Sequence, residues 1–504
     1  MSPPQYQHFM PQFLIRNFSH PYKPEGGRKR GKRKKEEGLY YNESVVRTLD
    51  LTTDDPVFRE VPVKQILGQM NAYEVAENAS GRQRSIESML GKLESQAARV
   101  FRKIIKAYKE PQDPHQGTAA VCLTRGERNL LRKFIFLLKY RALNFHRRFN
   151  RDTPEEYMSS DRELMLEYMA EKGYKRPLDV WLDNIQAIID IEIDVEDEWT
   201  KELPKRMYPL DALWFIGDME GYYTAICVPS DPYNEFILTD ASCGIFEGPH
   251  TCTENEETGV RESSIHTPLH MFTPVSPKLM IVLRDCSFPD PLEDANEDIR
   301  KWKEQVRQKA EMLHGDQGRG ILHDLPVAKP SNSYSSIIDG AKLEFHKGHD
   351  GKIRMDDKFN FPFFPISTRH INLINGIFLD NSGRCSNVVF DTKSSFAKTL
   401  EWYLTTEDMV KITDGFVEDG QREAVQKLEI ASRSLGSTGM TIATRLDPIP
   451  AEIQAHRRSQ VMLQKTSYRF WKNAIFNGEE VLQHESSVIR FYLKTGDHSF
   501  YQAT

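Results

Sequence analysis

The stretch TRGERNLLRKFIFLLKYR (residues 124–141) predicts a buried helix around which the rest of the chain can be arranged. Thr124 and Glu127 have the S/T-x-x-E spacing of a capping box, which satisfies backbone N–H groups at a helix start. Arg141 lies four residues after Leu137 and four before Phe145, so it projects from the apolar face. Because an unpaired buried charge costs several kcal/mol, Arg141 needs a partner. The apolar face consists of Leu130, Leu131, Phe134, Leu137, Leu138 and Phe145.

The segment before this helix, residues 83–106, predicts a second amphipathic helix. Its apolar residues recur every three or four positions and form one stripe. Glu94 directly follows Leu93 of that stripe, which places its carboxylate at the edge of the buried surface. Glu94 is therefore a candidate partner for Arg141. The stripe consists of Ile86, Leu90, Leu93, Ala97, Val100, Phe101 and Ile104.

Helical periodicity continues to about residue 193 and then gives way to strand-like runs. Residues 154–172 and 177–193 predict helices, whereas short apolar runs from about residue 212 favour a mostly antiparallel sheet. HTCTENEETGVRESS (250–264) predicts a loop. We therefore expect an α+β fold in which N-terminal strands join this sheet and a helical block packs with it. The predicted strands are ALWFIGD, YYTAICV, EFILTDAS and HMFTPVSPKLMIVLRD.

The predicted α+β core spans residues 5–403 and contains two polar segments. The first, 24–37, carries a basic block that repels itself, so we expect a disordered insertion. The second, 284–330, predicts a strongly charged surface helix and a linker. HINLINGIFLDN and SSFAKTLEWYL predict further helices near the end of the core. Residues 404–504 predict a mainly helical C-terminal extension, with a long helix at 451–476.

The composition predicts a soluble protein of the cytoplasm or nucleus that makes no membrane contact. Of the 504 residues, 39% are hydrophobic and 28% charged, and the net charge is −6. Any basic surface for a partner must therefore be local. The six cysteines form no C-x-x-C pair, which favours reduced thiols. No secretory signal and no apolar run of ~18–20 residues is visible. The oligomeric state is not indicated.

Familiar catalytic signatures are absent, and the sequence assigns no metal and no cofactor. His266 and His270 are four residues apart, but Pro268 between them disfavours a helical zinc pair. Asp240 follows an apolar strand and precedes Gly244 by four residues. Polar residues at a strand end are a common place for a site. A turn in which Asp240 caps its own backbone is the favoured interpretation.

The segment QHFMPQFLIRNF (7–18) predicts a strand that begins with a polar pair. If it stays extended past Pro11, His8 and Arg16 share a face and lie roughly 26 Å apart. That separation is too large for both side chains to contact one reacting atom. Imidazole suits proton transfer near neutral pH, although a lone His beside a strand is more often structural.

His8, Glu94, Arg141 and Asp240 form the candidate catalytic set, because together they supply a base, a cation and two carboxylates. The basic tract at residues 28–35 predicts contact with a nucleic acid or an import receptor, or else a solvated insertion. The candidate binding residues are Gln7, Arg16, Arg28, Lys29, Arg30, Lys32, Arg33, Lys34 and Lys35.

The opening segment also resembles the signature line, Q-H-x-x-P-x-x-x-L-R-x-F, of the domain-of-unknown-function family numbered 4238. Later segments resemble the family in the same order, over residues of about 5–403. Ala241 and Ser242 replace the Asn-Pro that usually follows the family's aspartate. The resemblance implies no reaction, because the activity of that family is not assigned. The matching opening positions are Gln7, His8, Pro11, Ile15, Arg16 and Phe18, and the later segments are LGKLESQAARVFRKI, FIFLLKYRALNFHRR, FILTDAS, FTPVSPKLMIVL and HINLINGIF.

Two functions follow from these patterns. The first is a binding or regulatory module, in which the candidate residues form a buried polar network and the basic tract acts in import. The alternative is a metal-assisted nucleic-acid phosphodiesterase, in which the same residues surround a cleft and the tract holds the polyanion. The packing of Arg141 discriminates between them, because an arginine sealed against Glu94 away from any pocket favours the module.

Overall fold

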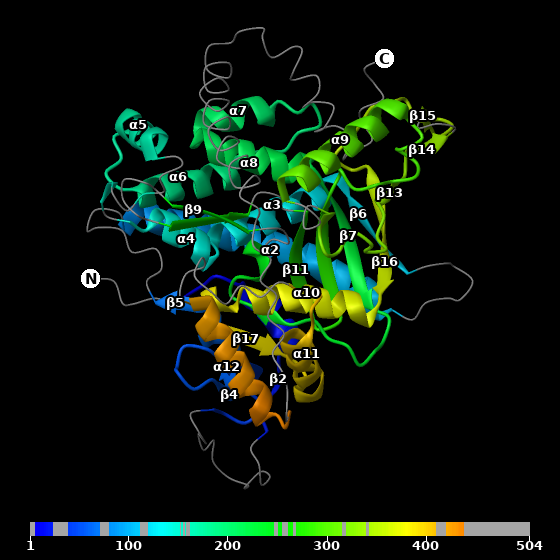
Figure 1. The fold of residues 1–504 in the computed structure, drawn as a ribbon. Helices are drawn as coiled ribbons and strands as arrows, with labels where there is room; N and C mark the ends of the chain where they lie inside the picture. Colours follow the sequence, from blue (N-terminus) through cyan, green and yellow to red (C-terminus); the bar gives the residue numbers. More distant parts are fainter. Residues whose placement is uncertain are drawn as a thin grey trace.

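The computed structural model shows an α+β protein, as the sequence predicts, with a helical block and two main sheets (Figure 1). The helical block and the larger sheet occupy the upper part of Figure 1, and the smaller sheet lies below with the last helices. Among the described residues, no helix is both long and apolar enough to cross a membrane. The structure describes residues 6–23, 39–70, 80–110, 119–151, 153, 154, 157, 162–245, 250–254, 261–265, 269–314, 319–338, 342–409 and 420–437.

The larger sheet has the strand order β11-β12-β7-β16-β13, and β6 also pairs with β16. Neighbouring strands are antiparallel except β16 and β7, which run parallel. Its strands are β6 (Ala120–Thr124), β7 (Tyr222–Pro229), β11 (His270–Ser276), β12 (Leu279–Asp285), β13 (Ser331–Asn332) and β16 (Lys358–Ile366).

This sheet separates two hydrophobic cores. Side chains alternate between the two faces of a strand, and both faces of β12 are buried. Leu279, Ile281 and Leu283 pack in the core of the helical block. Met280 and Val282 pack in the second core, with the helices after residue 368 and the smaller sheet. The larger sheet is therefore the middle layer of the molecule.

The smaller sheet has the order β2-β3-β17-β8, with β4 paired to β3, and all of its pairs are antiparallel. The expectation that the N-terminal strands join the larger sheet is therefore wrong. The edge of β3 pairs with β17, which arrives from more than 330 residues later in the chain, a partner that local patterning does not reveal. The strands are β2 (His20–Pro21), β3 (Ser44–Asp50), β4 (Val57–Pro62), β8 (Leu238–Thr239) and β17 (Asn387–Phe390).

The helical block contains the two helices predicted first. The capping box is present, because Glu127 N–H donates to Thr124 Oγ1 at 3.1 Å and Thr124 N–H donates to Glu127 Oε2 at 2.8 Å. Residues 212–218, expected as a strand, instead lie in a helix. A short buried apolar run does not distinguish the two by periodicity, and Pro209 fixes a helix start here. The helices are α2 (Ser80–Lys109), α3 (Arg125–Arg141), α4 (Leu143–Phe149), α5 (Arg162–Lys172), α6 (Pro177–Asp190), α7 (Trp199–Arg206) and α8 (Pro209–Glu220).

Short elements connect these layers. The predicted loop at 250–264 contains the hairpin strands β9 and β10, so that prediction is wrong. Threonine, which favours strands, alternates along β9. The remaining short elements are β1 (Tyr6–His8), α1 (Gln12–Ile15), η1 (Arg16–Phe18), η2 (Val63–Gln65), β5 (Gly68–Met70), η4 (Ser242–Gly244), β9 (His250–Glu254), β10 (Arg261–Ile265), β14 (Ser335–Ile338), β15 (Lys342–Phe345) and η6 (Ser382–Arg384).

The later helices complete the second core. The charged helix α9 (Glu297–His314) is attached to the fold by Lys303, which is 2% exposed and donates to Glu293 Oε2 at 2.8 Å. Helices α10 (Thr368–Asp380), α11 (Lys393–Thr405) and α12 (Gly420–Ser434) follow. The predicted helix at 451–476 and the basic tract at 28–35 lie outside the described residues. The predicted boundary near residue 403 stays a prediction.

Candidate functional site

The N-terminal segment enters the core as a strand and then turns into a helix. His8 pairs with Gly68 of β5, and Phe9 N–H donates to Leu67 O at 3.0 Å. Pro11 is the N-cap of α1, so the expectation of a strand through residue 18 is wrong beyond His8. A proline at a helix start is sterically compatible, because its missing N–H would have no helical partner. Arg16 is exposed and donates to Gln12 Oε1 at 3.0 Å.

Arg141 makes the predicted contact with Glu94. Its Nη1 donates to Glu94 Oε1 at 3.0 Å, and its Nη2 donates to the backbone oxygen of His8 at 3.2 Å. Arg141 is 5% exposed, whereas Glu94 is half-buried. One guanidinium therefore joins α3, α2 and β1 through charge-assisted hydrogen bonds. The structure brings His8, Glu94 and Arg141 together and leaves Arg16 outside this group.

The ring of His8 has one partnered and one free nitrogen. It hydrogen-bonds to the backbone of Val63, whereas Nε2 is buried with no hydrogen-bond partner among the described residues. The bond to Val63 therefore uses Nδ1. Burial lowers the pKa of the His8 ring, so the ring favours its neutral form, and Glu94 and Arg141 act on that pKa with opposite signs. A neutral ring that donates from Nδ1 presents a lone pair at Nε2, which can accept a proton.

Asp240 directly follows β8, and its carboxylate binds Ser386, which lies 146 residues further along the chain. That Asp240 caps its own backbone stays a prediction. Its Oδ2 accepts hydrogen bonds from the backbone N–H, at 2.9 Å, and the hydroxyl of Ser386. Its Oδ1 is buried without a hydrogen-bond partner in the described structure. Burial raises the pKa of the Asp240 carboxyl. The Ser242 hydroxyl closes the turn by accepting from Thr239 N–H at 2.7 Å.

Tyr6 packs against the ring of His8, and sequence reasoning missed it. The rings of Tyr6 and His8 meet edge to face, with centroids 5.0 Å apart. Burial raises the pKa of the Tyr6 phenol, and the carboxylate of Asp240 raises it further. The period-two alternation of a strand places Tyr6 and His8 on one face, which is the signal that could have found it.

A buried asparagine positions the strand that carries Asp240. Asn375 of α10 is fully buried, accepts from Ile237 N–H at 3.2 Å and donates to Glu235 O at 2.8 Å. The backbone before Asp240 is thus fixed from the second core. Within the described residues, no three His, Cys, Asp or Glu side chains are arranged to hold a metal ion. The Gln7 side chain and residues 28–35 lie outside the description.

A pocket that the sequence did not reveal lies beside the first half of α3. It is partly open to solvent and encloses about 30 Å³. Arg125, Arg128 and Arg132 line it from α3, at positions i, i+3 and i+7 on one helix face. Their spacing is the available signal, but arginines on an amphipathic helix usually indicate a solvated face. Three carboxylates also line the pocket: Asp194, Asp197 and Glu220.

The pocket arginines are held by protein oxygens and aromatic rings, and the partners of Arg125 include the carboxylate of Asp357, 3.5 Å from its Nη2. Arg125 Nη2 donates to Tyr334 Oη at 3.0 Å, and Arg132 Nη2 donates to Tyr222 O at 2.6 Å. Arg128 lies over the Phe359 ring, 4.5 Å from its centroid, a favourable cation–π contact. Arg128 also donates to Asn129 Oδ1 at 3.1 Å.

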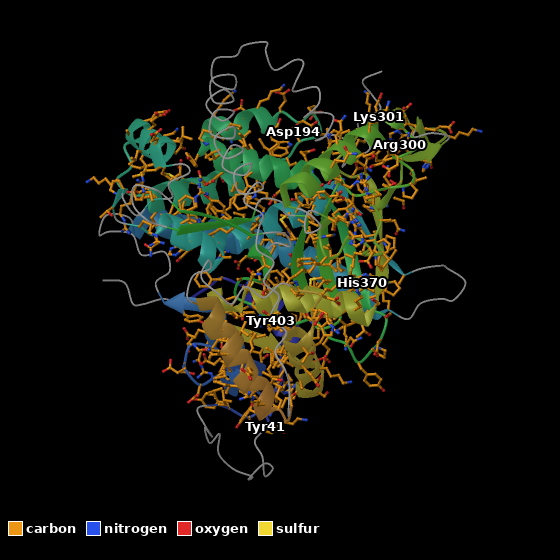
Figure 2. All side chains as sticks on the ribbon, viewed as in Figure 1. Tyr41, Asp194, Arg300, Lys301, His370 and Tyr403 are labelled. Atoms are coloured by element: carbon orange, nitrogen blue, oxygen red, sulfur yellow. The ribbon has the colours of Figure 1, made fainter. Side chains whose placement is uncertain are left out.

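Backbone contacts hold one of the carboxylates that line the pocket. Both carboxylate oxygens of Asp194 accept backbone N–H groups at the start of α7, from Glu198 and Trp199, each at 3.1 Å. Figure 2 labels Asp194 in the upper part of the molecule, beside this helix. Asp197 has a φ of +61°, a left-handed conformation that few non-glycine residues adopt. Strained backbone of this kind is frequent beside ligand sites.

Comparison with known proteins agrees with the opening motif. A family profile described as "Protein of unknown function (DUF4238)" matches residues 6–394. No curated protein and no solved structure matches the chain. The matched residues run from β1 to the first two residues of α11 and include His8, Glu94, Arg141 and Asp240. The chain therefore belongs to the DUF4238 family.

Proposed function

We propose that this chain is a binding module, that its ligand site is the arginine-lined pocket, and that the His8–Glu94–Arg141 cluster braces the fold. The observation that carries the proposal is the convergence of Arg125, Arg128 and Arg132 on one pocket. Guanidinium groups present rigid pairs of N–H donors that match carboxylate and phosphate oxygens. The ligand class is accordingly a small molecule with a phosphate or carboxylate group.

The contacts of Arg141 support a bracing role. Its two nitrogens bind the carboxylate of Glu94 and the backbone of His8, so the guanidinium is committed to parts of the fold. Removal of one partner of such a pair leaves the other charge partly buried, and a loss of about 3–5 kcal/mol is typical of buried pairs. Glu94 is half-buried, so water screens its side of the pair and a smaller loss is expected.

Calorimetric titration with inorganic pyrophosphate tests the pocket. We expect binding to the wild type, and a loss of affinity of at least about tenfold in Arg128→Gln, since a charged hydrogen bond contributes about 1.5–3 kcal/mol. Arg128→Lys keeps the charge but loses the two-pronged geometry, so its affinity should be intermediate. Arg16→Gln is the matched control, because Arg16 is exposed and outside the pocket. Equal affinity in wild type and Arg128→Gln would sink the proposal.

One observation favours the alternative function, a metal-assisted phosphodiesterase. The Nε2 of His8 is buried and has no hydrogen-bond partner in the described structure, and a neutral imidazole nitrogen can act as a general base if a substrate reaches it. The test is cleavage of single- and double-stranded nucleic acid with Mg²⁺ or Mn²⁺, comparing the wild type with His8→Ala. Metal-dependent turnover that disappears in His8→Ala would replace the module with the enzyme. If there is no turnover, or if turnover is the same in His8→Ala as in the wild type, the phosphodiesterase function is excluded.

A further inference from the structure

Helix α2 carries a one-sided array of positive charge on its exposed face. Residues 88–109 contain a single acidic residue, Glu94, which is half-buried beside Arg141. All the other charged residues in this span are basic and exposed, in a chain whose net charge is −6. We call them the α2 stripe: Lys92, Arg99, Arg102, Lys103, Lys106 and Lys109.

The α2 stripe is straight and follows the helix axis. With 100° of rotation per residue, its members fall within an arc of about 120°. From Lys92 to Lys109 it extends about 26 Å, at 1.5 Å per residue. Lys103 pairs with Glu127 at 2.7 Å, and Lys106 with Glu110 at 3.5 Å. The other four cations have no acidic partner among the described residues, so most of the stripe is uncompensated.

The opposite face of α2 limits what the stripe can contact. Ile86, Leu93 and Phe101 are buried in the core, and the apolar residues near the end of the helix are partly buried against it. A helix that binds a bilayer surface inserts its apolar face into the lipid, and α2 has none to offer. Single-stranded nucleic acid requires exposed rings for base stacking, but Tyr108 is half-buried and packs against Phe363. A phosphate backbone requires only cations along a line.

We infer that the α2 stripe binds the phosphate backbone of a nucleic-acid duplex without reading its bases. The contact is electrostatic, so affinity falls steeply with salt. Four unpaired cations give a slope of log K against log salt of about −3.6. This inference concerns another surface than the arginine-lined pocket and does not depend on the pocket.

The experiment is fluorescence anisotropy with a labelled 24-base-pair duplex of mixed sequence, at about 50–200 mM salt. The test variant is Arg99→Glu/Arg102→Glu/Lys106→Glu. The control is Arg300→Glu/Lys301→Glu/Arg307→Glu, which reverses three exposed cations of α9, where acidic residues are interspersed (Figure 2 labels Arg300 and Lys301). Both variants change net charge equally and keep residues 28–35. Thermal unfolding checks that each is folded.

We expect the test variant to lose at least about tenfold in affinity and to show a shallower salt slope by about two to three, with less than threefold loss in the control. Equal losses in the two variants would show that net charge alone acts, and would overturn the inference. No effect of the test variant would assign binding to another segment, also against it. Binding to anionic vesicles but not to duplex would overturn it too. Arg128→Gln should leave duplex binding unchanged, which separates this result from that of the pocket.

Discussion

Arg141 shows how one buried cation sets the position of several segments. Its contacts with Glu94 and with the backbone of His8 hold α2, α3 and β1 at one point. The pair with Glu94 is predictable, because a core-facing arginine needs an acid and spacing places one nearby. The contact with the His8 backbone is not predictable in this way, since any residue carries a carbonyl oxygen.

The pKa of His8 leads to a prediction about stability and pH. Burial lowers that pKa below the ordinary value of 6.5. As pH falls through 6.5, the unfolded chain therefore takes up a proton before the folded chain does, and stability falls until the lowered pKa is passed. Well above pH 6.5 the His8 ring is neutral in both the folded and the unfolded chain, so it no longer makes the free energy of unfolding depend on pH.

Urea unfolding of the wild type and of His8→Gln between pH 7.5 and 5 measures this effect. Glutamine can still donate to the backbone but does not titrate. We expect the free energy of unfolding to fall less with acidification in His8→Gln than in the wild type. Parallel curves for the two proteins would show that His8 titrates alike in the folded and unfolded states.

Among the elements, α3 has the best-defined beginning, and its capping box gives a quantitative prediction. Thr124→Ala removes the hydroxyl that accepts the Glu127 N–H. We expect the free energy of unfolding to fall by about 1 kcal/mol, within a range of about 0.5–2. Ser95→Ala, at an exposed position inside α2, is the control and should change stability little. A loss below a few tenths of a kcal/mol for Thr124→Ala would contradict the prediction, and chemical denaturation measures both.

The sequence predicts an element well where a periodic or capping signal marks it and poorly where neither is clear. Helix α2 is predicted because its apolar residues recur at helical spacing, and α3, although buried on nearly all sides, is predicted because its apolar residues follow a capping box. The run at 212–218 is buried on most sides, so its period is hidden, and strand was the wrong choice. In QHFMPQFLIRNF the apolar residues indicate burial, but the strand ends at His8 and Pro11 caps the start of a helix.

At the scale of the whole molecule, the site needs long-range contacts that local patterns do not contain. The pocket combines Arg125 with Asp194, Glu220 and Ile353, which are separated by up to 228 residues in sequence. The spacing of the arginines on α3 is visible in the sequence. No periodicity in the sequence shows which carboxylates line the pocket with them. The joining of β3 to β17 is hidden for the same reason.

The second core extends to the last described helix, α12. We therefore expect buried and exposed positions of α12 to differ strongly in how much a substitution lowers the free energy of unfolding. Leu428 is fully buried there, whereas Ile430 is 42% exposed. Leu428→Ala should lower the free energy of unfolding by about 2–5 kcal/mol, because it removes transfer energy and leaves a cavity. Ile430→Ala, on the same helix, should cost far less. Similar small losses for both would mean that α12 is not part of the cooperative core, and thermal or urea unfolding decides.

The alternation of β12 between two cores has a consequence for how the gene can change. An insertion or deletion of one residue inside a strand turns every following side chain to the opposite face. In β12 that shift would send Met280 and Val282 toward the helical block and Ile281 and Leu283 away from it, so both cores would be repacked by one event. Insertions and deletions should therefore be tolerated far less in β12 than in surface connections, because this strand contributes side chains to both cores.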